Sequence, residues 1–286
     1  MMAIKRLILS FFLAFSIISC SKESSDIATP NLDPKHYYEA LNISYGADKN
    51  QTFDLYLPAN RSSATKVMVL IHGGGWSAGD KSEMDGIKDI MRLELPEMAI
   101  VNINYTLATA DKKPYPMQIN DITAVIDHLK AKKEYYVMSE DFGFLGASAG
   151  AHLALLWSYA FDEDHIKMVG SIVGPTDLSA PFYLDSPDAN IKTLIDLFGI
   201  NATTEFLKKV SPYYQATASS PPTILFYGGK DPLVPASQGD QMADKLQQLG
   251  VTHEYTLYEN AGHGWIGPEL LDTWTKFKIF TQRHLL

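Results

Sequence analysis

The stretch that decides the fold is Phe142-Gly143-Phe144-Leu145-Gly146-Ala147-Ser148-Ala149-Gly150-Ala151-His152-Leu153-Ala154. It has the pattern of a short apolar strand that runs into Gly-x-Ser-x-Gly and then into a helix beginning with small residues. A serine on so sharp a turn has strained backbone angles, and side chains two residues before or after it would collide with neighbouring elements. Gly146 and Gly150 remove that bulk and leave the Ser148 hydroxyl exposed above the sheet. Small residues cluster in many strand-to-helix turns, so a nucleophilic serine is a hypothesis that the rest of the chain must support.

Segments with strand and helix patterns alternate on both sides of this stretch. The predicted strands cover 51–57, 66–71, 98–103, 142–145, 167–173, 223–227 and 253–258, and the predicted helices cover 116–132, 237–249 and 269–284. The strand at 66–71 is a continuous apolar run, as in strands buried on both faces, whereas 51–57 alternates and is expected to be half-exposed. Strands alternating with long helices predict the α/β class, a mostly parallel twisted sheet with helices on both faces. No repeat or second linker divides the chain, so residues 36–286 are expected to form one domain.

Residues 178–218 interrupt this alternation. The segment is rich in proline and aromatic residues and predicts short helices outside the sheet. Because open α/β sheets bind ligands beyond the carboxyl ends of their strands, such an insertion can form a small cap or lid over a pocket. A structural cap that packs on the core is the alternative, and the two roles are compatible.

Composition excludes several classes of protein. The chain has 286 residues, of which 46% are hydrophobic and 20% are charged, and its formal net charge is −9. This charge and the lack of a basic cluster argue against a nucleic-acid partner. One cysteine, and eight histidines without a His-x-x-x-His pair, provide no zinc site or disulfide framework. The sequence leaves the oligomeric state open.

The amino terminus resembles a bacterial lipoprotein signal. Two basic residues precede the apolar run 7–18, which is too short to span a bilayer and suits a signal-peptide core. The run ends in Ile17-Ile18-Ser19-Cys20, which is similar to a lipoprotein cleavage box. We expect residues 1–19 to be the signal peptide, Cys20 to be lipidated and residues 20–35 to form a flexible tether. This predicts an extracytoplasmic protein anchored by lipid in a bacterial cell envelope, on a membrane face that the sequence does not specify. Secretion with a free cysteine is the alternative.

A serine nucleophile needs a base, and the base needs a group that orients it. Asp231 follows the predicted strand 223–227 on a loop shaped by glycine and proline, and His263 follows the strand 253–258 between two glycines. Both therefore fall at the same sheet edge as Ser148. Considered alone, Asp231 could be a turn former and His263 a capping residue. The three strand ends taken together favour a catalytic triad.

A glycine-rich loop follows the strand 66–71. Acyl transfer builds negative charge on a carbonyl oxygen, and backbone N–H groups stabilise that charge where the chain approaches closely, which glycine permits. Gly74 and Gly75 in His72-Gly73-Gly74-Gly75-Trp76, together with Ala149, are the expected oxyanion-hole donors. A phosphate-binding loop is the alternative, but Gly-Lys-Ser/Thr and the dinucleotide glycine pattern are missing.

These motifs together resemble an esterase of the α/β-hydrolase superfamily. The resemblance rests on the glycine loop, Gly79-Asp80-Lys81, Asn104-Tyr105, the serine motif, Asp231-Pro232 and Gly262-His263. It is nearest to the hormone-sensitive-lipase-like branch with bacterial carbohydrate-acetyl and feruloyl esterases, and kynurenine formamidases are similar. The resemblance implies the α/β-hydrolase fold and a serine carboxylesterase without cofactor. Thr106 stands where an arginine often follows Asn-Tyr, and Ala151 stands where many relatives have a further glycine.

Other residues near the motifs have structural alternatives. Trp76 and Tyr105 are candidate substrate contacts, although Trp76 could equally pack beside the glycine loop. His72 is expected to anchor that loop by hydrogen bonds, and His152 is expected to pack inside. Asp177 is expected to shape a turn or cap a helix rather than act as a catalytic acid.

The expected activity is hydrolysis of small acyl or carbohydrate esters through an acyl-enzyme. An amidase or peptidase of formamidase type would use the same triad, and a hydrolase-fold binding module is a different class. The sequence does not identify the acyl or alcohol group.

Overall fold

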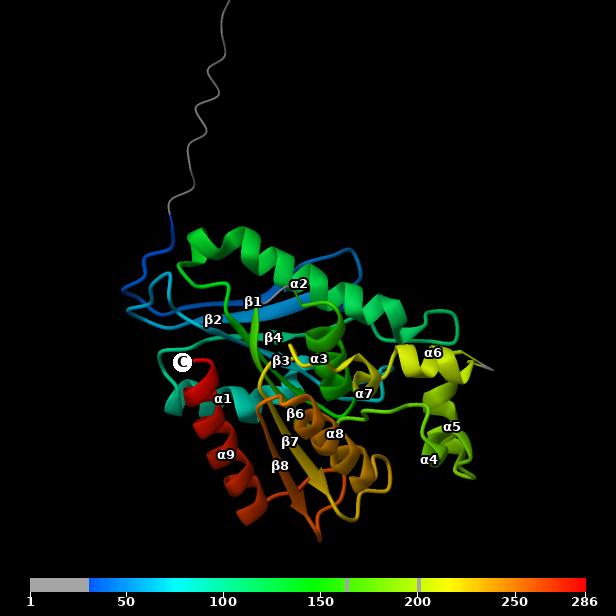
Figure 1. Ribbon diagram of the computed structural model, residues 1–286. Coiled ribbons are helices and arrows are strands. Elements are labelled where there is room, and N and C mark those ends of the chain that lie inside the picture. Colours follow the sequence, from blue (N-terminus) through cyan, green and yellow to red (C-terminus); the bar gives the residue numbers. More distant parts are fainter. Residues whose placement is uncertain (1–30, 163–164, 200–201) are drawn as a thin grey trace, which may run out of the picture. The chain divides into compact units, whose positions relative to one another are not determined.

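A computed structural model describes residues 31–162, 165–199 and 202–286 (Figure 1). The expected signal peptide and Cys20 lie outside the described residues. The eight strands described below form one sheet in the order β1-β2-β4-β3-β5-β6-β7-β8. The pairs β1/β2 and β2/β4 are antiparallel, and all the other neighbouring pairs are parallel. The strands are β1 (Tyr38–Ser44), β2 (Thr52–Leu57), β3 (Val67–Ile71), β4 (Ala99–Ile103), β5 (Phe142–Ala147), β6 (Ile166–Ile172), β7 (Thr223–Gly228) and β8 (His253–Tyr258).

Helices cover both faces of this sheet (Figure 1). The helices α2 (Pro114–Tyr136), α3 (Ala149–Ala160) and α8 (Ala236–Leu249) pack on one face, and η1 (Lys81–Met84), α1 (Asp85–Glu94) and α9 (Pro268–His284) pack on the other. Alternate residues of a strand belong to different clusters: Val69 is buried with the first set of helices and Leu70 with the second. This two-sided burial explains why the parallel strands are apolar throughout.

The polar face of β2 is covered, so the expectation that this strand is half-exposed is wrong. Asp54 accepts a hydrogen bond from the Asn42 N–H at 2.7 Å and lies 3.4 Å from the Lys81 ammonium group. The Arg92 guanidinium group lies 5.0 Å from the centre of the Tyr56 ring. Neither β1 nor α1 was predicted, and these two unpredicted elements supply Asn42 and Arg92. The polar residues of β2 are therefore buried as partners rather than exposed to solvent.

Four short helices lie between β6 and β7, in the segment for which helices outside the sheet were predicted. They are α4 (Pro181–Leu184), α5 (Ala189–Asp196), α6 (Thr204–Lys209) and α7 (Pro212–Gln215). Two of them begin with proline, whose fixed φ suits the first helical turn.

The folded unit begins before residue 36, which corrects the expected end of the tether. The Leu32 N–H donates to the Tyr135 carbonyl at 2.9 Å, and the Leu32 side chain packs against the core. The Arg61 N–H donates to the Pro34 carbonyl. Residues 31–35 thus belong to the folded unit. Within the described ranges, no helix is both long enough and apolar enough to cross a membrane.

Candidate active site

Ser148 sits on the strained turn between β5 and α3. Its φ of +53° and ψ of −120° lie outside the regions that L-residues prefer. A Cβ at Gly146 would lie 2.4 Å from Gly150 backbone atoms, and a Cβ at Gly150 would lie 2.2 Å from the carbonyl oxygens of Ile71 and His72. Both glycines are therefore required for α3 to approach the sheet closely enough to support this turn.

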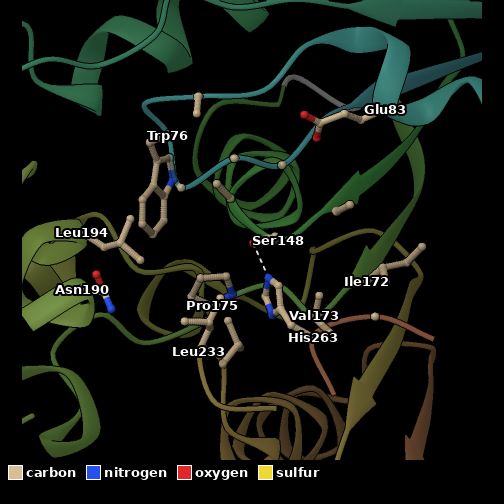
Figure 2. A pocket seen from close by; sticks show the side chains of 18 of the residues that line it. Trp76, Glu83, Ser148, Ile172, Val173, Pro175, Asn190, Leu194, Leu233 and His263 are labelled. Atoms are coloured by element: carbon tan, nitrogen blue, oxygen red, sulfur yellow. Dashed lines mark hydrogen bonds between the residues drawn. The ribbon is translucent and has the colours of Figure 1, made fainter. Parts of the chain in front are cut away.

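The carboxyl ends of three parallel strands bring Ser148, Asp231 and His263 together. His263 Nε2 lies 2.9 Å from Ser148 Oγ, the contact drawn in Figure 2, and His263 Nδ1 lies 2.7 Å from Asp231 Oδ2. A carboxylate can only accept, so Nδ1 carries the proton and Nε2 is left as the acceptor for the serine hydroxyl. This is the geometry of a general base that is oriented by a carboxylate.

The carboxylate of Asp231 is held on both oxygens. Its side chain is completely buried, while the His263 side chain remains 27% exposed. Oδ1 accepts hydrogen bonds from the N–H groups of Leu233 and Val234 at 2.8 and 3.0 Å, and Oδ2 accepts from His263. The loop after β7 therefore fixes the direction in which the carboxylate points.

The glycine loop after β3 faces the serine. Gly74 and Gly75 have φ values of +98° and +55°, and a Cβ at Gly74 would lie 2.1 Å from the Ala78 carbonyl oxygen. Within the described ranges, the N–H groups of Gly74 and Gly75 have no hydrogen-bond partner. Ala149 is the first residue of α3, so its N–H group has no hydrogen-bond partner within that helix. Gly74, Gly75 and Ala149 line one cavity of about 760 Å³ together with Ser148 and His263.

Tyr105 holds the glycine loop in place through hydrogen bonds to its backbone. It is fully buried, does not line the cavity, and its hydroxyl lies within hydrogen-bond distance of the His72 and Gly73 carbonyl oxygens, at 3.0 and 2.9 Å. Its ring stacks on the His72 imidazole with centroids 4.3 Å apart. The expectation of a substrate contact is therefore corrected to a supporting role. His72 is an anchor, as expected: its Nδ1 lies 2.8 Å from the Gly73 carbonyl, and burial lowers the pKa of its imidazole.

The Gly79-Asp80-Lys81 and Asn104 motifs form a second support. The Asn104 amide donates to the Asp80 carboxylate at 2.8 Å, and the Asn104 side-chain oxygen accepts from the Lys81 N–H at 2.6 Å. Burial works against the charged form of Asp80, but hydrogen bonds from Ser82 and Asn104 outweigh it and lower the pKa of Asp80 to about 2. Asp80 is thus a charged cap of η1 that fixes the far end of the loop.

Trp76 contributes mainly through packing. Only 3% of the residue is exposed, its indole N–H donates to His152 Nδ1 at 3.2 Å, and its ring packs edge-on against Phe198. It still borders the cavity (Figure 2), so its ring can meet a ligand over a small area. His152 packs inside, as expected, and burial lowers the pKa of its imidazole to about 4.

Asp177 shapes a turn, as expected. Its carboxylate accepts hydrogen bonds from the N–H and hydroxyl groups of Ser179, at 2.8 and 2.6 Å. It does not line the cavity. Among the described residues, no group of three or more His, Cys, Asp or Glu side chains could hold a metal ion.

The cavity has two sides, and residues of the segment 178–218 line one of them. Figure 2 shows Trp76, Asn190 and Leu194 on one side of Ser148, and Glu83 and Ile172 on the other. The first side comes from the glycine loop and α5, and the second from η1 and the end of β6. An apolar pattern at Ile87, Ile90 and Met91 was the available sign of α1, beside the second side. α5 lies in the segment 178–218, for which the sequence predicts a cap or lid beside a pocket, and its residues Asn190 and Leu194 line this cavity.

The chain matches one family and several characterised proteins. The BD-FAE family profile matches residues 53–246. A probable isoprenylcysteine alpha-carbonyl methylesterase of Arabidopsis thaliana is 27% identical over 257 residues, which cover 79% of this chain and 51% of that protein. The esterase LipC of Mycobacterium tuberculosis is 23% identical over 258 residues, which cover 83% of this chain and 62% of that protein. The chain thus spans between about half and three fifths of the length of these two relatives.

The solved structures agree on the fold. A truncated carbohydrate esterase from gut microbiota superposes with a TM-score of 0.70 at 19% identity, covering 88% of this chain and 99% of that one. At this identity the similarity concerns the fold alone. Together with the observed sheet, it confirms the expected α/β-hydrolase fold.

Proposed function

This chain belongs to the BD-FAE family of α/β-hydrolase esterases, and from that premise we propose that it is a serine carboxylesterase that hydrolyses small acyl or carbohydrate esters. The observation that carries this proposal is the unbroken hydrogen-bonded chain from Ser148 through His263 to Asp231. Ser148 and His263 line the same cavity as Gly74, Gly75 and Ala149.

In the proposed mechanism, His263 Nε2 takes the proton from the Ser148 hydroxyl while Oγ attacks the ester carbonyl carbon. The carbonyl oxygen becomes an oxyanion that accepts hydrogen bonds from Gly74, Gly75 and Ala149. The alcohol leaves with the proton from His263, and Ser148 keeps the acyl group. Water then attacks the acyl-enzyme, gives a proton to His263, and the acid leaves as Ser148 recovers its proton.

Asp231 holds His263 in the required tautomer and stabilises the imidazolium ion. This base must be neutral to accept the serine proton, so only the neutral imidazole of His263 supports the reaction.

Two observations support the substrate class. Relatives across the superfamily carry esterase names, and one structural neighbour is described as a carbohydrate esterase. A lipid anchor at Cys20, which remains a prediction, would place such an enzyme outside the cytoplasm, where acylated polysaccharides are found. Acetylated and feruloylated sugars are therefore the first substrates to test.

Labelling with a fluorophosphonate probe tests the nucleophile. The probe phosphonylates an activated serine, so we expect rapid labelling of the chain and none in Ser148→Ala, with loss of p-nitrophenyl acetate hydrolysis in the same variant. Ser77→Ala removes an exposed serine from the neighbouring loop and should leave both readouts intact.

The same experiment separates the alternatives. Absence of labelling in the unmodified chain would favour a binding module. Labelling combined with faster cleavage of arylamides or formylkynurenine than of esters would favour an amidase.

A further inference from the structure

A second cavity adjoins the catalytic pocket on the side that faces α1 and α9. It encloses about 400 Å³. Five residues line both cavities and form the boundary between them: Glu83, Ile87, Ile172, Leu270 and Thr273. The second cavity therefore lies directly beside the catalytic pocket, between the sheet and these two helices.

Hydrocarbon forms the walls of this second cavity. Leu145 and Phe226 line it from the sheet, and Phe277 lines it from α9, all three being almost completely buried. Ile90 of α1 closes the opposite side. The two helices are held together beside it by an ion pair between Lys278 and Glu94 at 2.8 Å.

Two of the five boundary residues, Thr273 and Glu83, have polar side chains. The Thr273 hydroxyl accepts from the Trp265 indole N–H at 2.8 Å and lies 2.8 Å from the Glu269 carbonyl. Glu83 brings a negative charge, which disfavours a ligand group carrying a negative charge of its own. The cavity therefore suits an uncharged hydrocarbon group.

Leu270 and Leu271, which line this cavity, are 46% and 64% exposed, so the cavity is an apolar groove that a ligand can enter from solvent. Such a space lacks the polar partners that hold ordered water, and apolar ligands enter it favourably. Gly86 stands at its edge, and a Cβ there would meet no atom within 4 Å. The cavity is thus open at its edge, and it shares five lining residues with the pocket that holds Ser148.

Building on the proposed esterase function, we propose that this second cavity binds a straight hydrocarbon arm of the ester, so that esters with such an arm are better substrates than acetates of small alcohols. The arm can belong to the acyl group or to the alcohol, because both flank the carbonyl carbon that Ser148 attacks. The residues that line only the second cavity, such as Ile90, then determine the accepted chain length without touching the reacting atoms.

Two substrate series distinguish the two sources of the arm. One consists of methyl esters of straight-chain acids from acetate to decanoate, and the other of acetates of straight-chain alcohols from methanol to octanol, both followed by proton release. Burial of one methylene group corresponds to about a fourfold gain. We expect kcat/KM to rise by up to about that factor per carbon in one series, until the cavity is filled.

The variant Ile90→Trp fills the cavity from α1 and should abolish that rise while leaving methyl acetate hydrolysis within about twofold of the original rate. Leu93→Trp introduces the same side chain one turn along α1, at a residue that is 78% exposed and lines neither cavity, and should keep the rise. An unchanged chain-length profile in Ile90→Trp, or no rise in either series for the unmodified chain, would overturn the proposal.

If Ile90→Trp loses methyl acetate hydrolysis as well, the variant Ile90→Ala tests whether this cavity sets the preferred chain length. It enlarges the same space, so the preferred chain should lengthen, and an unchanged preference overturns the proposal. Failure of the esterase function itself has a different signature, which is absence of hydrolysis of every ester together with absence of fluorophosphonate labelling.

Discussion

Burial separates the roles of the histidines. His263 keeps about a quarter of its side chain exposed and contacts both Ser148 and Asp231. His152, one turn after the nucleophile, is completely buried between Trp76 and the Val210 carbonyl. Desolvation disfavours its charged form, which is why its pKa falls to about 4. One imidazole is available for proton transfer and the other is a neutral part of the core.

The neutral state of His152 predicts a loss of stability in mild acid. Its pKa in the folded chain is about 4, below the ordinary value of 6.5, so the unfolded chain binds more protons between these two pH values. The free energy of unfolding therefore decreases as the pH falls from about 6.5 to 4, by about 3 kcal/mol in total from this residue. Urea unfolding at pH 7 and pH 4.5 measures the effect.

The variant His152→Leu should be less stable at pH 7, because the Val210 carbonyl loses its partner, but its stability should depend less on pH. His36→Leu removes an exposed imidazole and serves as the control. Equal pH dependence in His152→Leu and the unmodified chain would show that His152 is not the group responsible.

At the scale of elements, the position of α3 on β3 depends on one glycine. A Cβ at Gly150 would lie 2.2 Å from two carbonyl oxygens at the end of β3, so Gly150→Ala must push α3 away from the sheet. We expect it to lower the free energy of unfolding by at least about 2 kcal/mol and to reduce kcat by moving Ser148. Urea unfolding and ester hydrolysis measure the two effects.

Gly86 on α1 provides the matched control. A Cβ there meets no atom within 4 Å, so Gly86→Ala should raise stability by about 0.5–1 kcal/mol through helix propensity. If both substitutions had the same effect, close packing of α3 would not be the reason for Gly150.

Helices and strands could be predicted from the sequence where the order of apolar and polar residues in the element matches the faces that are buried. Strands β3, β5 and β7 are apolar because helices cover both faces, and Ser148 and Asp231 could be placed because each follows such a strand. His263 follows β8, a half-buried edge strand, and its place rested on the chain order and on the glycines beside it. The position of β1 could not be predicted in this way, because its burial pattern alternates irregularly around a break in register. The contact between α5 and the glycine loop depends on how the insertion folds back, which local sequence does not encode.

At the scale of the whole molecule, attachment through Cys20 remains a prediction. In a bacterial host, the full chain should fractionate with membranes and incorporate labelled palmitate. Cys20→Ser should release the activity into the soluble fraction and abolish the label, whereas Ser21→Ala should behave as the unmodified chain. Equal distribution of all three between the fractions would contradict the anchor.

The hydrogen bond from Leu32 to Tyr135 fixes where the folded unit begins. Tyr135 lies at the end of α2, just before β5 begins, and is therefore at the amino edge of the strands, whereas Ser148 lies at their carboxyl edge. The folded unit thus starts on the side opposite to its catalytic mouth. Residues 31–35 therefore leave the mouth above Ser148 uncovered, and a bulky polymer can approach it without displacing the start of the fold.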